Sequence, residues 1–218
     1  MSKKILCFGD SLTWGWVPKD HAVPTERYAS DVRWTGVLST TLGDEYEIIE
    51  EGLSGRTTTA DDPTDPRLNG STYLPSALAS NLPLDLVILM LGTNDTKAYL
   101  NRTPLEIATG VSVLVGQILG SAGGVGTAYP APAVLLMSPP PLGKITNPWL
   151  QQIFDGGHAK TAELADRYQA LASFFGIPFF DAGSVISTDG IDGIHFTESN
   201  NRELGQALAP EVKRILGS

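Results

Sequence analysis

Short apolar runs alternate along the chain with longer segments in which apolar residues recur at helical spacing. The short runs predict buried strands, because the strands of a parallel sheet are covered on both faces. Strands are expected at residues 4–8, 47–51, 86–91, 134–137 and 178–180. The longer segments predict helices at residues 34–42, 74–79, 104–119, 159–175 and 198–216. This alternation is typical of an α/β fold with a central parallel sheet and crossover helices.

The helix expected at residues 104–119 has the clearest start. Thr103 can cap it, Pro104 takes its first position, and Glu106 completes a capping box. By contrast, three connections are long for a compact domain: residues 14–33, 59–72 and 139–157. Such loops either line a site or an interface, or merely cover the edges of the sheet, and the sequence favours neither interpretation.

Composition adds limits on partners and location. At 218 residues, with 42% hydrophobic and 18% charged residues, the chain is expected to form one globular domain over residues 1–218. A net charge of −9 argues against nucleic acid and anionic membranes, which require clustered Lys and Arg. The one cysteine, Cys7, cannot form an internal disulfide, and we expect it to be a small core residue. Neither a signal peptide nor an apolar run of roughly 18 residues is found, so no membrane association and a cytoplasmic location are expected.

Clusters of glycine and polar residues follow the expected strands. They occupy residues 9–12, 52–57, 92–95 and 189–196. In open parallel sheets a ligand binds outside the carboxyl ends of the strands. The first three clusters would converge there by topology alone. The fourth follows the last strand and precedes the last helix, so it can reach the same edge.

Ser11, His195 and Asp192 are the candidates for nucleophilic catalysis in these clusters. Ser11 lies on a tight turn where a helix N-terminus would favour developing negative charge. A serine hydroxyl needs a neighbouring base, and His195 alone among the three histidines lies in a cluster with a carboxylate at close spacing. Asp192, three residues earlier, could hold one imidazole nitrogen while the other faces Ser11. Asp189 is the competing carboxylate, at a less favourable spacing.

Three donors are candidates for stabilising an oxyanion: the backbone N–H groups of Ser11 and Gly55 and the side-chain amide of Asn94. Gly55 fits because the backbone can approach a substrate closely where no side chain intervenes. Taken singly, Ser11 could be a helix cap, Asn94 a turn residue and His195 a structural histidine. Their joint occurrence in the required order favours catalysis.

These clusters together resemble the four sequence blocks of the SGNH-hydrolase (GDSL esterase/lipase) family. The blocks are Gly9-Asp10-Ser11-Leu12, Gly55, Gly92-Thr93-Asn94-Asp95 and Asp192-Gly193-Ile194-His195. The residues that name the family would be Ser11, Gly55, Asn94 and His195. Residues 11–16 are further similar to the bacterial arylesterase/acyltransferase branch. Glu50 departs from the pattern, because many members carry Asn at this place.

The resemblance implies a three-layer α/β/α fold like flavodoxin, with no metal and no cofactor. His21 and His158 agree with this, because two distant histidines make a poor metal site. The implied activity is that of a serine esterase or acyltransferase. It would act on small carboxylic esters through an acyl-enzyme on Ser11 and transfer the acyl group to water, an alcohol or a peroxide. The alternative is a catalytically inactive, flavodoxin-like ligand-binding module, which would have no reason to keep Asp192 and His195 beside Ser11.

Transfer to an acceptor other than water requires a narrow, apolar approach to the nucleophile. The residues expected to form it are Leu12, Trp16, Trp149, Phe154 and Ile194, although they could equally belong to the core. All four tryptophans of the chain lie in or beside the loops at residues 14–33 and 139–157, and aromatic residues are enriched at interfaces. With the resemblance, this predicts a homo-oligomer in which these loops pack against neighbouring subunits. Ordered loops on a monomer are the alternative.

Overall fold

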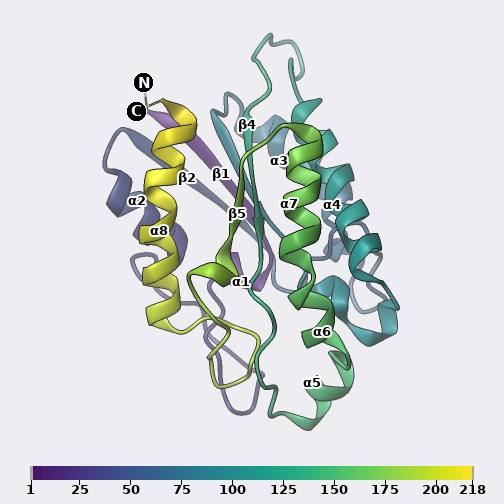
Figure 1. Cartoon of the computed structure of the whole chain (residues 1–218). Coiled ribbons are helices and arrows are strands. Elements are labelled where there is room, and N and C mark those ends of the chain that lie inside the picture. Colours follow the sequence, from purple (N-terminus) through teal and green to yellow (C-terminus); the bar gives the residue numbers. More distant parts are fainter. Residues whose placement is uncertain (1, 218) are drawn as a thin grey trace.

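A computed structural model describes residues 2–217 and shows a five-stranded parallel sheet at the centre of the molecule (Figure 1). The strands are β1 (Lys3–Gly9), β2 (Tyr46–Gly52), β3 (Leu86–Met90), β4 (Ala133–Ser138) and β5 (Phe179–Asp181). Their order is β2-β1-β3-β4-β5, and every neighbouring pair is parallel. This is the strand order of flavodoxin-like folds, whose ligands bind at the carboxyl ends of β1 and β3, where the order reverses.

Helices cover both faces of the sheet, which confirms the three-layer arrangement. One face carries α2 (Trp34–Leu42) and α8 (Glu198–Leu216), and the other carries α3 (Gly70–Asn81), α4 (Pro104–Leu119) and α7 (Leu164–Phe175). Short helices lie at the carboxyl edge: α1 (Ser11–Trp14), α5 (Pro148–Ile153) and α6 (Gly157–Ala162). Single 3-10 turns are η1 (Pro66–Leu68), η2 (Asn94–Thr96), η3 (Ala98–Leu100) and η4 (Ala182–Ser184).

Strand β1 shows how the core is divided between the two layers. Its side chains alternate, so that Leu6 and Phe8 pack against the α3, α4 and α7 layer, whereas Ile5 and Cys7 pack against α2 and α8. All four side chains are fully buried. Burial on both faces is the reason why the sequence of this strand is a continuous apolar run.

Helix α3 begins four residues before its predicted start. The Asn69 side chain accepts the backbone N–H of Ser71 and caps the helix. Pro75 lies inside it and has no N–H to offer to the carbonyl one turn earlier. That carbonyl, on Ser71, accepts instead from Gln117 Nε2 of α4 at 2.9 Å. A contact with a neighbouring helix therefore stabilises a turn that its sequence alone does not favour.

The segment between β4 and β5 contains three helices, α5, α6 and α7, where the sequence predicts one. The expected helix at residues 159–175 is two helices, α6 and α7, which meet at Glu163. The expected loop at residues 139–157 contains α5, which Asn147 caps through its side chain and Pro148 begins. An Asn-Pro pair is a recognisable helix start, so α5 could have been predicted.

Candidate active site

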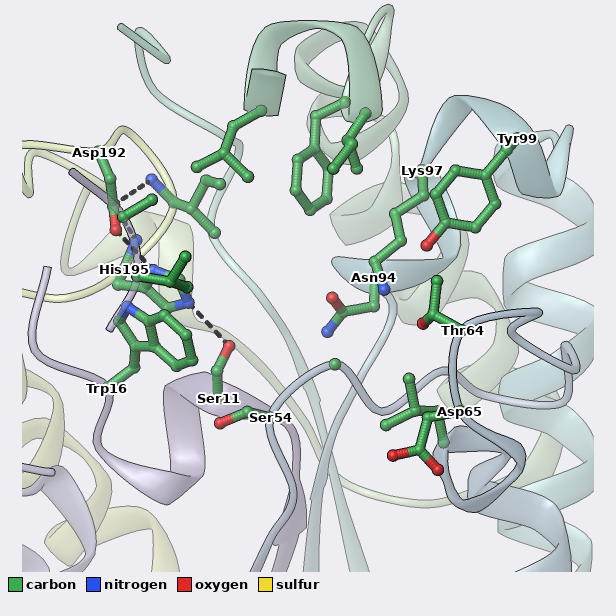
Figure 2. A pocket seen from close by; sticks show the side chains of 18 residues that line it. Ser11, Trp16, Ser54, Thr64, Asp65, Asn94, Lys97, Tyr99, Asp192 and His195 are labelled. Atoms are coloured by element: carbon green, nitrogen blue, oxygen red, sulfur yellow. Dashed lines mark hydrogen bonds and ion pairs between the residues drawn. The ribbon is translucent and has the colours of Figure 1, made fainter. Parts of the chain in front are cut away.

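The four polar clusters meet at the carboxyl edge of the sheet. Ser11 begins α1 directly after β1, and Asn94 begins the 3-10 turn that follows β3. Gly55 lies in the loop after β2, and His195 lies in the loop before α8. All four residues line one cavity (Figure 2). The tertiary structure therefore brings together residues that the sequence distributes over most of its length.

Ser11, His195 and Asp192 form a continuous chain of hydrogen bonds (Figure 2). His195 Nε2 lies 2.9 Å from Ser11 Oγ, and His195 Nδ1 lies 2.7 Å from Asp192 Oδ2. Burial opposes ionisation of Asp192, but hydrogen bonds from His195 and the Ile194 N–H outweigh it and lower the pKa of Asp192. A carboxylate at Nδ1 favours the tautomer whose Nε2 accepts the Ser11 hydroxyl proton.

Asp192 also shapes the loop that carries the histidine. Its Oδ1 accepts the backbone N–H groups of Ile194 and His195, both at 2.9 Å. Gly193, inside this turn, has a φ of +70°, and a Cβ there would lie 2.4 Å from the carbonyl oxygen of Lys144. The turn therefore requires glycine. Asp189 is exposed to solvent instead, so Asp192 is the carboxylate that the structure pairs with His195.

The expected oxyanion donors surround the same cavity. Within residues 2–217, the backbone N–H groups of Ser11 and Gly55 have no hydrogen-bond acceptor. Gly55 has a φ of +88°, which glycine adopts without strain. Asn94 Nδ2 donates one hydrogen to Asp10 Oδ2 at 3.2 Å, which leaves its second hydrogen for a ligand. Preorganised donors of this kind can stabilise a negatively charged oxygen.

Two buried aspartates support this arrangement without lining the cavity. Asp10 caps α1 by accepting the Leu12 N–H at 2.9 Å, while its other oxygen binds Asn94. Burial raises the pKa of Asp10 to about 7. Asp95 accepts the Thr58 N–H at 2.9 Å and the Thr58 hydroxyl at 2.6 Å, and burial raises the pKa of Asp95 to about 6. Asp10 therefore caps a helix, and Asp95 holds the loop that contains Thr58.

The indole of Trp16 lies flat against the imidazole of His195. The ring centroids are 4.8 Å apart and the planes differ by 15°. The Trp16 backbone N–H donates to the carbonyl oxygen of Ser11 at 3.1 Å, which fixes the tryptophan to α1. The stack restricts rotation of the imidazole and keeps its plane beside the indole.

Glu50, the departure from the family pattern, anchors the loop that carries Trp16. Its carboxylate accepts Arg33 Nε at 2.8 Å, Arg33 Nη2 at 2.7 Å and Arg27 Nη2 at 3.1 Å. Arg27 Nε also donates to the Trp14 carbonyl oxygen at 2.6 Å. These bonds tie residues 14–33 to β2. A glutamate at this position therefore has a structural function in this chain.

A cavity of about 510 Å³ lies over Ser11, and its two ends differ in chemistry. Beside His195 the cavity has apolar lining residues: Trp16, which stacks on the imidazole, and Ile194, which precedes the histidine in the chain. On the far side of Asn94 the wall is polar (Figure 2). That polar wall consists of Thr64, Asp65, Lys97 and Tyr99. Leu150 and Ile153 of α5 and Phe154, which follows this helix, also line the cavity.

Three of the five expected substrate-binding residues line this cavity: Trp16, Phe154 and Ile194. Leu12 does not, because α1 turns its side chain into the core beside α2, where it is 3% exposed. Trp149 does not either, because it lies on the solvent side of α5 and is 67% exposed. The assignment of these two residues to the cavity was wrong. Part of the expected loop forms helix α5, so the position of each residue on this helix determines whether its side chain faces the cavity or solvent.

The polar wall was missed by the sequence analysis, although signals for it exist. Lys97 and Tyr99 directly follow the Asn94 cluster, and Lys97 donates its backbone N–H to the Asn94 carbonyl at 3.3 Å. Thr64 and Asp65 lie in the long loop at residues 59–72. A long loop near the carboxyl edge is a frequent source of site residues.

The cysteine and the two remaining histidines of the chain do not line this cavity. Cys7 is buried in β1, and burial raises the pKa of its thiol. His21 and His158 are exposed. Among residues 2–217, no group of three or more His, Cys, Asp or Glu side chains is arranged to hold a metal ion. Over the same residues, no helix has both the length and the apolar character required to cross a membrane.

Comparisons with known proteins find matches over nearly the whole chain. A family model described as GDSL-like Lipase/Acylhydrolase family matches residues 7–202. The structure of the native M. smegmatis aryl esterase is 71% identical over 99% of this chain and 100% of that chain, with a TM-score of 0.98. A carbohydrate acetylesterase from Sinorhizobium meliloti is 60% identical over 98% of this chain and 100% of that chain, with a TM-score of 0.97. A search of curated proteins finds no match.

Proposed function

The chain belongs to the GDSL-like lipase/acylhydrolase family of SGNH esterases, and on that premise we propose that it cleaves small carboxylic esters through an acyl-enzyme on Ser11. The observation that carries the proposal is the hydrogen-bonded chain from Ser11 through His195 to Asp192, which opens into a cavity. An inactive ligand-binding module is the alternative. It is disfavoured because binding alone does not require a serine, an imidazole and a carboxylate in this alignment.

Acylation follows from the positions of the atoms. His195 Nε2 removes the Ser11 hydroxyl proton as Oγ attacks the ester carbonyl carbon. The carbonyl oxygen becomes negative and accepts hydrogen bonds from the Ser11 and Gly55 N–H groups and from Asn94 Nδ2. As the ester bond breaks, the imidazolium returns the proton to the leaving oxygen. Asp192 stabilises the positive charge on His195 during this exchange.

Deacylation repeats these steps with a second nucleophile. His195 removes a proton from water, an alcohol or hydrogen peroxide, whose oxygen attacks the acyl carbon and releases Ser11 with its proton restored. The products are an acid, a new ester or a peracid, respectively. Transfer to alcohol or peroxide is favoured where few water molecules reach the acyl-enzyme. The apolar walls formed by Trp16, Phe154 and Ile194 support such transfer.

Aryl esters with short acyl groups are the proposed substrates. The apolar end of the cavity lies on the His195 side, where the leaving group must depart to receive its proton. A flat aromatic alcohol could pack there against Trp16 and Ile194. The name of the similar M. smegmatis aryl esterase supports the same choice.

Assembly into a homo-oligomer is a further part of the proposal. Trp34 is buried in the core, with Nε1 donating to the Leu12 carbonyl, and Trp14 and Trp16 are partly buried in the protomer. Trp149 remains available to a partner, as an exposed apolar side chain. Light scattering tests this: the mass of one chain, 23.2 kDa, at all micromolar concentrations would contradict it. The cytoplasmic location stays a prediction from the sequence.

The acyl-enzyme is tested with a serine-directed phosphonate and p-nitrophenyl acetate. One phosphonate adduct is expected, on the peptide that contains Ser11, and Ser11→Ala should lower turnover by several orders of magnitude while circular dichroism stays unchanged. Ser54→Ala is the matched control, because Ser54 lines the same cavity but has no histidine bonded to its hydroxyl. It should still be labelled at Ser11. Labelling elsewhere, with activity retained in Ser11→Ala, would exclude the mechanism.

A further inference from the structure

The polar wall of the cavity (Thr64, Asp65, Lys97 and Tyr99) has no part in the proposed chemistry at Ser11. It lies across the cavity from His195, beyond Asn94 (Figure 2). Polar side chains that are held in place at the wall of a cavity commonly fix the orientation of a ligand. Their hydrogen bonds show what this wall offers.

Lys97 is the central residue of the wall. Its ammonium donates to Asp62 Oδ2 at 2.8 Å, and the two side chains are 10% and 0% exposed. Among the described residues Asp62 is the one acceptor for this ammonium, so two of its three hydrogens remain for a ligand. Because Lys97 lines the cavity and the buried Asp62 does not, those hydrogens are the ones available to a molecule inside.

Asp62 holds the lysine in place and offsets its charge. It also accepts the Tyr99 hydroxyl at 2.9 Å, the Thr64 hydroxyl at 2.6 Å and the Thr64 N–H at 2.9 Å. Burial opposes ionisation of Asp62, but hydrogen bonds from Lys97 and Thr64 outweigh it and lower its pKa to about 2. Asp62 is therefore a carboxylate at neutral pH. The wall presents N–H donors without a net positive charge.

The position of His195 decides which half of an ester meets this wall. The leaving oxygen must lie near His195 Nε2 to receive its proton, and the carbonyl oxygen points to the oxyanion donors. The remaining substituent of the carbonyl carbon, the acyl chain, then extends away from His195. In this cavity that direction leads past Asn94 to Lys97.

Charge decides the kind of acyl group. Asp62 already neutralises Lys97, and Arg67 neutralises Asp65 through an ion pair at 2.6 Å, so the wall has no excess positive charge to attract a negatively charged acyl group. A neutral oxygen can accept the free Lys97 hydrogens and requires no such excess charge. Resting on the proposed function, we propose that this wall is an acyl subsite selective for acyl groups with a neutral hydrogen-bond-accepting oxygen, such as an ether or hydroxyl oxygen a few bonds beyond the carbonyl.

The test compares p-nitrophenyl methoxyacetate with p-nitrophenyl butanoate, which have the same leaving group and nearly the same acyl length. In the wild-type protein, the ratio of their kcat/KM values should exceed the ratio of their hydroxide-catalysed rate constants. The double variant Lys97→Met with Asp62→Asn removes the donor without leaving a buried charge unpaired. It should lower the enzymatic ratio by about tenfold, the usual effect of losing a hydrogen bond from a charged donor. Intrinsic reactivity of the two esters cancels in this comparison.

Lys213→Met is the matched control, because Lys213 lies on α8 outside the cavity, and its ratio should equal that of wild type. A wild-type ratio no greater than the hydroxide ratio would overturn the subsite, and this measurement requires no variant to fold. An unchanged ratio in the folded double variant, or faster turnover of the negatively charged p-nitrophenyl hemisuccinate than of the methoxyacetate, would overturn it as well. Failure of the proposed function would give a different result. In that case Ser11→Ala would turn over both esters as fast as the wild-type protein does.

Discussion

Asp10→Asn gives a sharp test of how the oxyanion site is held. In the structure, Asp10 accepts the Leu12 N–H through Oδ1 at 2.9 Å and Asn94 Nδ2 through Oδ2 at 3.2 Å. An amide at position 10 can keep the first bond with its oxygen, but its NH₂ group then faces the NH₂ group of Asn94. Two donors repel each other, so the Asn94 amide should turn over and present its oxygen in place of a donor.

The expected magnitude follows from that rotation. Loss of one oxyanion donor lowers kcat by roughly 10²–10³. Asp10→Asn should fall in this range although residue 10 does not line the cavity. Asn94→Ala should show a loss of the same size. The double variant should be no worse than Asn94→Ala alone, because both changes remove the same donor.

Stability provides a readout that distinguishes this effect from misfolding. Burial raises the pKa of Asp10 from 3.8 to about 7, and a tenfold change in an acid dissociation constant corresponds to about 1.4 kcal/mol. A carboxyl whose pKa is raised by folding stabilises the protein below its unfolded pKa, and this contribution is lost as the pH rises through about 7. The free energy of unfolding of Asp10→Asn should therefore decrease less than that of wild type between pH 5 and pH 8.

The assay is p-nitrophenyl acetate hydrolysis at pH 8, combined with urea unfolding at pH 5, 6, 7 and 8. Asp95→Asn is a useful comparison, because Asp95 is also a buried carboxyl with a raised pKa but accepts from Thr58 instead of Asn94. Wild-type kcat in Asp10→Asn, or losses that multiply in the double variant with Asn94→Ala, would refute the reasoning.

Three further predictions concern the base and the loop beside it. Trp16→Leu should lower kcat/KM by roughly tenfold, whereas Trp16→Phe should lose less because it keeps an aromatic face against His195; equal losses in the two variants would contradict the stacking argument. Glu50→Gln should lower the free energy of unfolding by about 2 kcal/mol in urea titrations, because the ionic hydrogen bonds to Arg33 and Arg27 weaken, and an unchanged midpoint would be evidence against this anchor. His195→Ala should lower kcat nearly as much as Ser11→Ala, because the two side chains act as a unit, and a variant that keeps most of the wild-type kcat would argue against a histidine base.

Local sequence signals determined most of the elements. Residues 34–42, 104–119 and 198–216 are helices with the predicted bounds, and the five predicted strands all overlap observed ones. These elements have strong periodic patterns or caps, which act within a few residues. Helix α3 has a cap at Asn69, but Pro75 lies inside it, and the contact from Gln117 of another helix that supports its first turn has no local sequence signal.

The sequence also determined which residues meet at the carboxyl edge. Parallel strands end at the same edge, so Ser11, Gly55 and Asn94 had to lie near one another once the strand pattern was known. The spacing of Asp192 and His195 within one turn favoured their pairing, which the structure contains at 2.7 Å.

Tertiary structure alone decided the contacts between segments far apart in the chain. The stack of Trp16 on His195 and the pairing of Lys97 with Asp62 join segments for which the sequence carries no common signal. The sequence also did not determine which way Leu12 and Trp149 face, because an apolar residue near the nucleophile can face the core, the cavity or solvent. Which of these it faces depends on the rotation of its helix against the rest of the molecule, and that rotation is set by packing over the whole fold rather than by neighbouring residues.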